Sequence, residues 1–306
     1  MYPSDLMSKP SSQNQQAQPQ IEAIKAALAE ENFQPLLIAL KPVLKTLYGT
    51  DPTQPELLMK ALGNIHQLPK DEWYVFFTVF MADIISHTDT GSKAFFDAAD
   101  FAWVTEVEQC YPAVQAEFTQ VANNVDALPA FQQFHEVQHK ITDDNKWKVL
   151  AFQAYGEMFN DNLSILPATA NLLSYIPNWT TGMFSILMPG KKIPPHEGPY
   201  KGVLRYHLGL TIPDECGINV NGETRHWQAG KSLLFDDTFE HFAWNNSDER
   251  RAVLFVDVMR PLPFPLNILN EWVILDVLHN SDFIQKSIDK SAFEYFQGTL
   301  QSEHSP

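Results

Sequence analysis

Glycines concentrated in one part of the chain limit the folds that this sequence can adopt. Eight of the 13 glycines lie within residues 182–230, and short strand-like runs separate them. Glycine at this spacing is typical of turns between antiparallel strands. Within this region, Asn221-Gly222 joins the apolar residues 218–220 to residues 223–227, which is a strong signal for a tight hairpin. The region therefore predicts a jelly-roll barrel whose mouth can hold a small cofactor and a substrate.

The part of the chain before the glycine-rich region has a helical pattern. Apolar residues recur on one helix face, as in Ile21, Ile24 and Leu28, while the first residues are rich in Ser, Pro and Gln. This contrast predicts an α+β protein in which a helical region precedes a jelly-roll or cupin-like domain. We expect a disordered leader over residues 1–20, a helical region over 21–90, the barrel with flanking helices over 91–265 and a helical extension over 266–306.

Charge, cysteine content and hydropathy exclude several classes of protein. The chain has 21 basic and 37 acidic residues, and its formal net charge of -16 repels nucleic acid and anionic membranes. Two cysteines are too few for a disulfide framework, so we expect a cytoplasmic protein. The apolar run at residues 73–82 is too short for a transmembrane segment and predicts a buried helix. Residues 262–278 are also apolar; packing against the barrel is the first interpretation, and a homo-oligomer or membrane contact stays open.

Two histidines in the last third of the chain are candidate metal ligands. Neutral imidazole suits Fe(II), and His196 and His241 both fall within residues 91–265, where we expect the barrel. The usual two-histidine-one-carboxylate site takes its acid from the second residue after the first histidine, but that residue is Gly198. Asp237 lies four residues before His241. It is the best local candidate to hold a bound water or to orient an imidazole. We therefore predict catalytic roles for His196, His241 and Asp237.

Strand geometry predicts that two arginines and a third histidine point into the same barrel as the candidate metal ligands. Side chains at positions i and i+2 share one face of a strand, so Arg205 and His207 should point the same way. Arg251 shares its face with the apolar residues that follow at alternate positions and should point inward, whereas Arg250 should point outward. A guanidinium can grip a carboxylate through two parallel hydrogen bonds. An iron site beside such a clamp is what an oxygenase that uses 2-oxoglutarate needs.

A series of short segments follows one order within residues 101–261. The segments are Trp147-Lys148-Val149, Pro167-Ala168-Thr169, Ser185-Ile186-Leu187-Met188-Pro189-Gly190, His196-Glu197-Gly198-Pro199, Leu204-Arg205-Tyr206-His207-Leu208-Gly209-Leu210, Phe235-Asp236-Asp237-Thr238-Phe239-Glu240-His241, Trp244-Asn245-Asn246 and Asp257-Val258-Met259-Arg260-Pro261. In this order they resemble the aspartyl/asparaginyl β-hydroxylase family. Members that hydroxylate peptides also lack the metal carboxylate, so Gly198 fits the family.

The resemblance implies a double-stranded β-helix in which His196 and His241 hold Fe(II). The residues that it implies for binding 2-oxoglutarate are Arg251, Arg205, His207 and Ser185. Such a dioxygenase consumes O2 and 2-oxoglutarate and hydroxylates an unactivated C–H bond. We expect the substrate to be the β-carbon of an Asp- or Asn-like residue, free or in a peptide, or a related small acyl or amino-acid compound. A lipid acyl chain is a third option, disfavoured by the acidic composition and the lack of an anchor.

Two alternatives belong to other functional classes. His135-Glu136-Val137-Gln138-His139 fits the H-E-x-x-H pattern of zinc hydrolases, in which His135 and His139 bind the metal and Glu136 is the base. This pentamer also arises by chance, and Lys140 places a charge beside its second histidine. A non-catalytic cupin-like binding protein is the other alternative, and the presence of both histidines with Arg251 argues against it.

Overall fold

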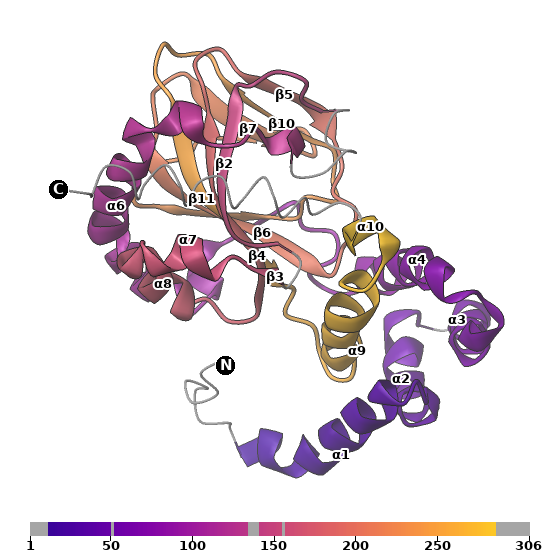
Figure 1. Cartoon of the computed structure of the whole chain (residues 1–306). Helices are drawn as coiled ribbons and strands as arrows, with labels where there is room; N and C mark the ends of the chain where they lie inside the picture. Colours follow the sequence, from indigo (N-terminus) through magenta and orange to yellow (C-terminus); the bar gives the residue numbers. More distant parts are fainter. Residues whose placement is uncertain (1–11, 50–51, 134–140, 155–156, 286–306) are drawn as a thin grey trace.

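The computed structural model describes residues 12–49, 52–133, 141–154 and 157–285. Figure 1 shows a β-barrel with helices along one side and a separate group of helices beside it. The barrel consists of a seven-stranded sheet and a four-stranded sheet that face each other, and their strands pair antiparallel. This architecture is the cupin-like jelly roll predicted from the glycine-rich region, so the expected α+β fold with a helical region is confirmed.

The strand order places sequence-distant strands side by side. The larger sheet has the order β1-β9-β6-β11-β4-β2-β3 and the smaller sheet the order β5-β10-β7-β8. The strands of the larger sheet are β1 (Phe95–Phe96), β2 (Trp147–Ala154), β3 (Glu157–Met158), β4 (Trp179–Leu187), β6 (Val203–Thr211), β9 (Ser232–Phe235) and β11 (Arg251–Met259). Those of the smaller sheet are β5 (Lys192–His196), β7 (Cys216–Val220), β8 (Glu223–Arg225) and β10 (His241–Asn245).

Helices occur before the barrel, on its outer face and after it. The α-helices are α1 (Ser12–Ala29), α2 (Gln34–Leu47), α3 (Thr53–Gly63), α4 (Trp73–Ser86), α5 (Val104–Gln109), α6 (Tyr111–Asn123), α7 (Asn160–Ser164), α8 (Pro167–Ser174), α9 (Leu266–Trp272) and α10 (Asp282–Gln285). A π-helix spans Val273–Leu278, and short 3-10 helices span Ile65–Gln67, Lys70–Glu72, Ala98–Asp100, Val125–Ala127 and Phe131–Gln133.

Strand β11 is buried on both faces, and its alternating side chains define the inside and the outside of the barrel. Val253 and Phe255 belong to the core between the two sheets, together with Ile218 of β7. Leu254 and Val256 point to the other face and pack against α5, α6 and α8. The inward phase predicted for the odd-numbered positions of this strand is therefore confirmed, and it places Arg251 on the inner face.

Local sequence signals explain two connections. Asn221 and Gly222 form the turn between β7 and β8 with positive φ angles of 52° and 81°, which Asn and Gly adopt more readily than other residues. Helices α5 and α6 are separated at Cys110, because Pro112 suits the first turn of the second helix.

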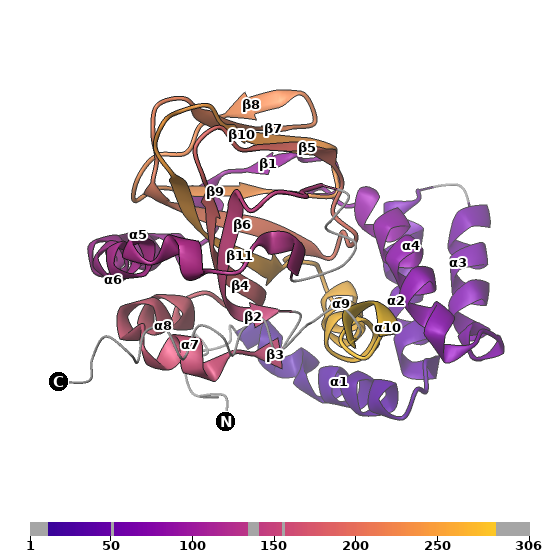
Figure 2. The ribbon, with the colours of Figure 1, turned by 45° about the horizontal axis from the view of Figure 1, so that its top comes forward.

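The helical unit, defined as α1 to α4 together with α9 and the π-helix, combines helices that precede the barrel in the sequence with helices that follow it. Figure 2 shows α1 passing beside α9, with α2 and α4 next to them. One apolar core joins the two contributions, including Leu40 of α2, Phe77 of α4, Leu269 of α9 and Ile274 of the π-helix. The helix expected at residues 73–82 is confirmed as part of α4; it buries one face, which includes Phe77 and Phe80, and leaves Val75 and Val79 exposed.

Two expectations about domain organisation need correction. Helix α1 already begins at Ser12, inside the stretch predicted to be a disordered leader, because its many Gln and Ala residues favour helix. Residues 266–278 share one core with the N-terminal helices, so the predicted helical region and the predicted extension are not separate units; the same core also includes Tyr200 at the end of the barrel, as the packing expected for residues 262–278 requires. Among the described residues, no helix is both long and apolar enough to cross a membrane.

Candidate active site

The two candidate metal ligands lie side by side at one end of the barrel, which we call the mouth. His196 ends β5, His241 begins β10, and the two residues are paired across these antiparallel strands. Their ring centroids are 4.1 Å apart. The Nδ1 atom of His196 lies 2.9 Å from the carbonyl oxygen of Pro194, and that of His241 lies 3.0 Å from the carbonyl oxygen of Phe239. A carbonyl can only accept, so each Nδ1 carries the proton and each Nε2 keeps a lone pair for a metal.

Both imidazoles are neutral at physiological pH. Burial, together with the neighbouring His196 and Arg205, lowers the pKa of His241 to about 3. Burial also lowers the pKa of His196. Neutral imidazole is the form that binds a metal ion, so the protonation state and the tautomer of both residues fit the predicted ligand role.

Asp237 fills the space that a side chain at position 198 would need. The amide of Gly198 donates a 2.7 Å hydrogen bond to the carbonyl oxygen of Asp237, which holds the two segments together. A Cβ atom added at Gly198 would overlap the carboxylate of Asp237. In the common iron site, the second residue after the first histidine supplies a carboxylate, and Gly198 cannot do so. The carboxylate of Asp237, from the connection between β9 and β10, lies against that position instead.

The surroundings of Asp237 suit a group that acts on a bound ligand. The residue is 1% exposed; its Oδ2 atom accepts a 2.9 Å ion pair from Arg205, while Oδ1 has no hydrogen-bond partner among the described residues. Burial raises the pKa of Asp237 to about 6, although Arg205 acts in the opposite direction. Within the described part of the chain, no three His, Cys, Asp or Glu side chains form a metal-binding group. Asp237 is thus adjacent to the histidine pair without completing a three-ligand set.

Arg205 forms ion pairs with two carboxylates at the mouth. Its Nε and Nη2 atoms donate to both oxygens of Asp257 at 2.9 and 3.1 Å, and Nη2 also reaches Asp237. The guanidinium lies over the Phe255 ring at 4.3 Å. The inward direction predicted for Arg205 is correct, but its neighbours favour a role in holding Asp237 over the expected contact with 2-oxoglutarate. Asp257 pairs directly with Arg205 across β6 and β11, and its place in phase with Arg251 was the signal for it.

The inner face of the barrel near Arg251, which we call the deep end, has the opposite character. Arg251 is 2% exposed, and its Nε and Nη1 atoms have no hydrogen-bond partner in the described structure. Burial lowers the pKa of Arg251 to about 10, which leaves the guanidinium charged at neutral pH. The side chain stacks over the indole of Trp227 at 4.4 Å. Such an unpaired buried cation fits a carboxylate ligand.

His207 lies beside this guanidinium and also has an unpaired atom. Its Nδ1 atom accepts a 3.2 Å hydrogen bond from the indole of Trp227, while its buried Nε2 has no partner among the residues described. The ring lies between Phe235 and Phe255, with centroid distances of 5.2 and 5.3 Å. Burial, followed by the charge of Arg251, lowers the pKa of His207 well below its ordinary value. Trp227 was not predicted from the sequence, because it lies in a connection without strand periodicity.

Ser185, which the resemblance implies for binding 2-oxoglutarate, also faces the inside of the barrel. It lies on β4 opposite Val253 and is buried. Its Oγ atom accepts a 3.0 Å hydrogen bond from the indole of Trp147. Because Ser185 accepts this bond, its own hydroxyl hydrogen is available to donate to another acceptor.

A buried charge cluster that the sequence did not reveal supports the loop before His241. The Asp236 carboxylate accepts a 2.8 Å ion pair from Lys201 and a second ion pair from Arg260. Its other oxygen accepts hydrogen bonds from the amide and hydroxyl of Thr238. Although burial alone would raise it, the pKa of Asp236 is lowered by Arg260 and Lys201. The cluster fixes the loop that carries Asp237.

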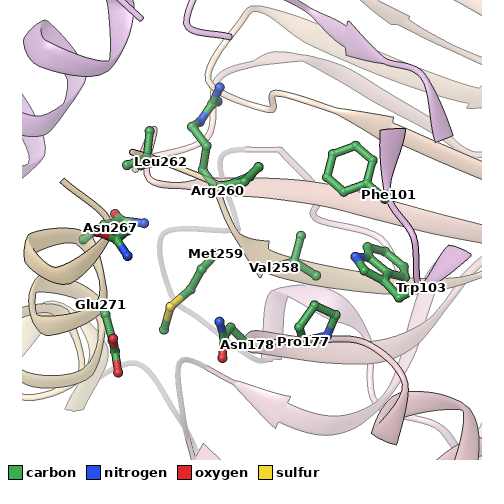
Figure 3. Close-up of a pocket in the computed structure, with 12 residues that line it drawn as sticks. Phe101, Trp103, Pro177, Asn178, Val258, Met259, Arg260, Leu262, Asn267 and Glu271 are labelled. Atoms are coloured by element: carbon green, nitrogen blue, oxygen red, sulfur yellow. The ribbon is translucent and has the colours of Figure 1, made fainter. Parts of the chain in front are cut away.

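Two cavities lie close to the site. The mouth cavity is lined by Thr180, Thr181, Pro199, Tyr200, Val203, Arg205, Asp237, Asp257, Ile274 and Leu278. It thus has a charged wall from the barrel and an apolar wall from the π-helix. Figure 3 shows a second cavity, between Phe101 and Trp103 on one side and Asn267 and Glu271 of α9 on the other. Among its described lining residues, none has an unpaired buried polar atom, so the mouth cavity is the better candidate for substrate.

The zinc-hydrolase alternative cannot be placed in this geometry. Its residues His135, Glu136 and His139 lie outside the described residues.

Comparisons with known proteins agree with the geometry of the barrel. The aspartyl/asparaginyl beta-hydroxylase family matches residues 108–261, about half of the chain. The ornithine lipid ester-linked acyl 2-hydroxylase of Rhizobium tropici is 39% identical over 208 residues, which are 67% of this chain and 74% of that protein. The human aspartyl/asparaginyl beta-hydroxylase is 37% identical over 128 residues, which are 40% of this chain but 17% of that protein.

Among solved structures, a Pseudomonas putida prolyl-4-hydroxylase covers 60% of this chain and 100% of its own, with 12% identity and a TM-score of 0.35. The family match extends from α5 to the end of β11 and includes the histidine pair, both inward arginines and the intervening strands. The resemblance inferred from the order of the motifs is confirmed. The chain belongs to the aspartyl/asparaginyl β-hydroxylase family of enzymes.

Proposed function

We propose that the protein is an Fe(II)- and 2-oxoglutarate-dependent dioxygenase that hydroxylates an unactivated C–H bond. The observation that carries this proposal is the set of three unpaired buried nitrogens at the deep end, Nε and Nη1 of Arg251 and Nε2 of His207. Leaving a buried donor without an acceptor is unfavourable, so such a set is best explained by a ligand that supplies acceptor oxygens. The carboxylate of 2-oxoglutarate is such a ligand.

The residues at the mouth fit Fe(II). His196 and His241 would hold the ion through their Nε2 atoms, because both Nδ1 atoms are engaged by backbone carbonyls. Two protein ligands leave coordination positions for a chelating co-substrate, a water and O2. When bound, iron with 2-oxoglutarate and O2 supplies the oxidising chemistry, and the co-products are succinate and carbon dioxide.

The remaining residues bind and orient. Arg251 and His207 would donate to the distal carboxylate of 2-oxoglutarate, and the hydroxyl of Ser185 can donate as well. Asp237 would accept a hydrogen bond through its unpaired Oδ1 from a water that completes the metal site. Arg205 holds Asp237 in place and is itself held by Asp257.

The mouth cavity favours an acyl chain as the substrate over an aspartyl side chain. Arg205 is the only basic residue among the described residues that line it, and two carboxylates already neutralise this guanidinium. A substrate carboxylate would therefore meet negative charge without a free cation, whereas Ile274 and Leu278 offer an apolar wall. The Rhizobium tropici relative is named for acting on an ester-linked acyl group. We propose hydroxylation of an acyl chain first and of an Asp- or Asn-like β-carbon second.

The cytoplasm is the proposed location. Both cysteines, Cys110 and Cys216, are unpaired, and a reducing compartment keeps iron in the ferrous state.

An iron-dependent succinate-release assay tests the proposal. Purified protein is incubated with Fe(II), 2-oxoglutarate and O2, and either an acyl-ornithine lipid in detergent or an Asp- and Asn-containing peptide is added. We expect the acyl substrate to stimulate succinate release and to gain one oxygen by mass spectrometry. Matched variants are Leu278→Asp, which places charge on the apolar wall and should reduce stimulation by the acyl substrate, and Leu163→Asp in α7, whose side chain packs away from the mouth cavity. A protein that hydrolyses a substrate with zinc and ignores 2-oxoglutarate would contradict the proposal.

A further inference from the structure

Trp227 contacts both residues that present unpaired donors at the deep end. Its indole nitrogen lies 3.2 Å from Nδ1 of His207, and its ring lies 4.4 Å from the guanidinium carbon of Arg251. The side chain is buried. The preceding residue, His226, hydrogen-bonds through Nδ1 to the carbonyl oxygen of Cys216 at 2.8 Å, which ties this segment to β7. Trp227 is therefore held in place independently of any ligand.

The hydrogen bond between Trp227 and His207 determines where the imidazole carries its proton. An indole N–H can only donate, so Nδ1 of His207 must be unprotonated and accept. Burial and the charge of Arg251 keep His207 neutral by lowering its pKa. A neutral imidazole has one ring proton, which must then be on Nε2. His207 is consequently a hydrogen-bond donor toward the inside of the barrel.

The opposite arrangement occurs at the two metal ligands of the same barrel. In His196 and His241, Nδ1 donates to a backbone carbonyl, and Nε2 is left as an acceptor. The partner of Nδ1 thus decides whether an inward Nε2 can bind a cation or an anion. In His207 that partner is Trp227, and a phenylalanine there would remove the constraint.

We propose that Trp227 is a positioning residue that makes His207 an obligate donor and holds the Arg251 guanidinium flat for the carboxylate of the co-substrate. The inference rests on the proposed function, because it assigns the deep end to 2-oxoglutarate. With Nε and Nη1 of Arg251, the His207 Nε2–H gives a site of donors only. A carboxylate, which only accepts, matches such a site, whereas the neutral amide of 2-oxoglutaramate would place donors against donors.

The first test reads the tautomer without any ligand. In protein labelled with 15N-histidine, two-bond 1H–15N couplings distinguish imidazoles protonated at Nε2 from those protonated at Nδ1. We expect His207, assigned by its loss in His207→Gln, to be protonated at Nε2 in the wild-type protein and to populate both tautomers in Trp227→Phe. Protonation at Nδ1 in the wild type, or an unchanged Nε2 preference in Trp227→Phe, would overturn the proposal.

The second test measures binding of 2-oxoglutarate to Mn(II)-loaded protein by calorimetry in the absence of O2. Trp227→Phe retains a ring beneath Arg251 but loses the indole N–H, and we expect about tenfold weaker binding. Trp73→Phe is the matched control, since Trp73 is a buried tryptophan of α4 whose indole donates to the carbonyl oxygen of Leu68. The control should retain wild-type affinity, and both variants are compared by thermal unfolding.

A double-mutant cycle separates positioning from a loss of structure. If Trp227 acts through His207, then Trp227→Phe should weaken binding little further in a His207→Ala background. Fully additive losses would contradict the proposed route through His207. If the wild-type protein bound no 2-oxoglutarate, the proposed function would fail at that point, whereas the ligand-free tautomer measurement would still decide the role of Trp227.

Discussion

The two inward arginines of the barrel lie at opposite ends of the site and differ in their hydrogen-bond partners. Arg205 at the mouth is surrounded by Asp237 and Asp257, and its charge is neutralised within the protein. Arg251 at the deep end is more deeply buried, yet two of its nitrogens have no partner in the described structure. Burying an unpaired charge is unfavourable. The difference indicates that the paired Arg205 stabilises the fold at the mouth, whereas the unpaired Arg251 suits the carboxylate ligand proposed above.

The same division extends to the other polar atoms of the two regions. The mouth presents acceptors, namely Nε2 of His196 and His241 and Oδ1 of Asp237. The deep end presents donors, from Arg251 and His207. A cation suits the first region and an anion the second. A ligand that chelates a metal with one end and presents a carboxylate at the other is complementary to both.

The sharpest way to break this comparison is to replace each arginine with methionine in the absence of metal and ligand. Arg205→Met leaves two buried carboxylates without a partner, so we expect a loss of about 3–5 kcal/mol in the free energy of unfolding. Arg251→Met removes an unpaired buried charge, and stability should be unchanged or increased. Urea unfolding measures both. Equal destabilisation by the two substitutions would show that the arginines do not differ as described.

Affinity for the co-substrate should show the reverse ranking. Arg251→Ala removes the charge-assisted partner of a buried carboxylate, which costs about 2–5 kcal/mol, roughly 30-fold or more in the dissociation constant of 2-oxoglutarate. Arg250→Ala is the control, because Arg250 points outward and donates to the carbonyl oxygen of Ala122. Calorimetry with Mn(II)-loaded protein decides the matter. If Arg250→Ala weakened binding as much, the strand phase would not determine the site.

Metal binding tests the mouth alone. Each histidine is one of the two proposed protein ligands, so His196→Ala or His241→Ala should weaken Fe(II) or Mn(II) binding by about 100-fold or more, which exceeds the loss expected from removing a residue that only hydrogen-bonds to a ligand. His226→Ala is the control, since this residue is held by the backbone of Cys216. Titration calorimetry gives the affinity, and circular dichroism checks the fold. Wild-type affinity in both ligand variants would remove the metal site from the mouth.

A smaller effect concerns acid sensitivity of the metal-free protein. The pKa of His241 is lowered to about 3, whereas an unfolded histidine titrates near 6.5. Below about pH 6.5 the unfolded chain binds a proton that the folded chain does not, so stability falls as pH decreases through this window. At about pH 5, His241 should contribute about 2 kcal/mol of this loss. Asp237, with its raised pKa, has the opposite sign, so the measurement compares wild type with His241→Gln.

In urea unfolding at neutral pH and at about pH 5, His241→Gln should lose less stability than the wild-type protein. An identical loss in the two proteins would show that His241 is protonated in the folded state well above its expected pKa.

The sequence predicted those parts of the site that follow strand periodicity. Alternation along β11 and β6 gave the inward direction of Arg251, Arg205 and His207, since side-chain direction in a strand depends only on position. The glycine-rich pattern likewise predicted the barrel. These features are local, so no knowledge of distant neighbours was required.

Contacts between connections were not predictable in this way. The carboxylate of Asp237 lies against Gly198 because two loops meet at the mouth, and Trp227 reaches His207 from a segment without regular structure. The pairing of Arg205 with Asp257 depends on the register between two strands, which alternation alone does not determine. The division of roles between the two arginines therefore emerges only when the strands are assembled.

The composition of the helical unit sets an order of events during synthesis. Helices α1 to α4 leave the ribosome before the barrel, but the residues that complete their core, such as Leu269 and Ile274, are made only after the last barrel strand. The apolar faces of the N-terminal helices therefore stay exposed until the barrel has been translated. Asn270 of α9 then binds the hydroxyl of Tyr200 and the carbonyl oxygen of Gly202, in the segment that follows His196. The segment that follows His196 therefore gains these contacts only after α9 has been made, so the candidate site is completed late in synthesis.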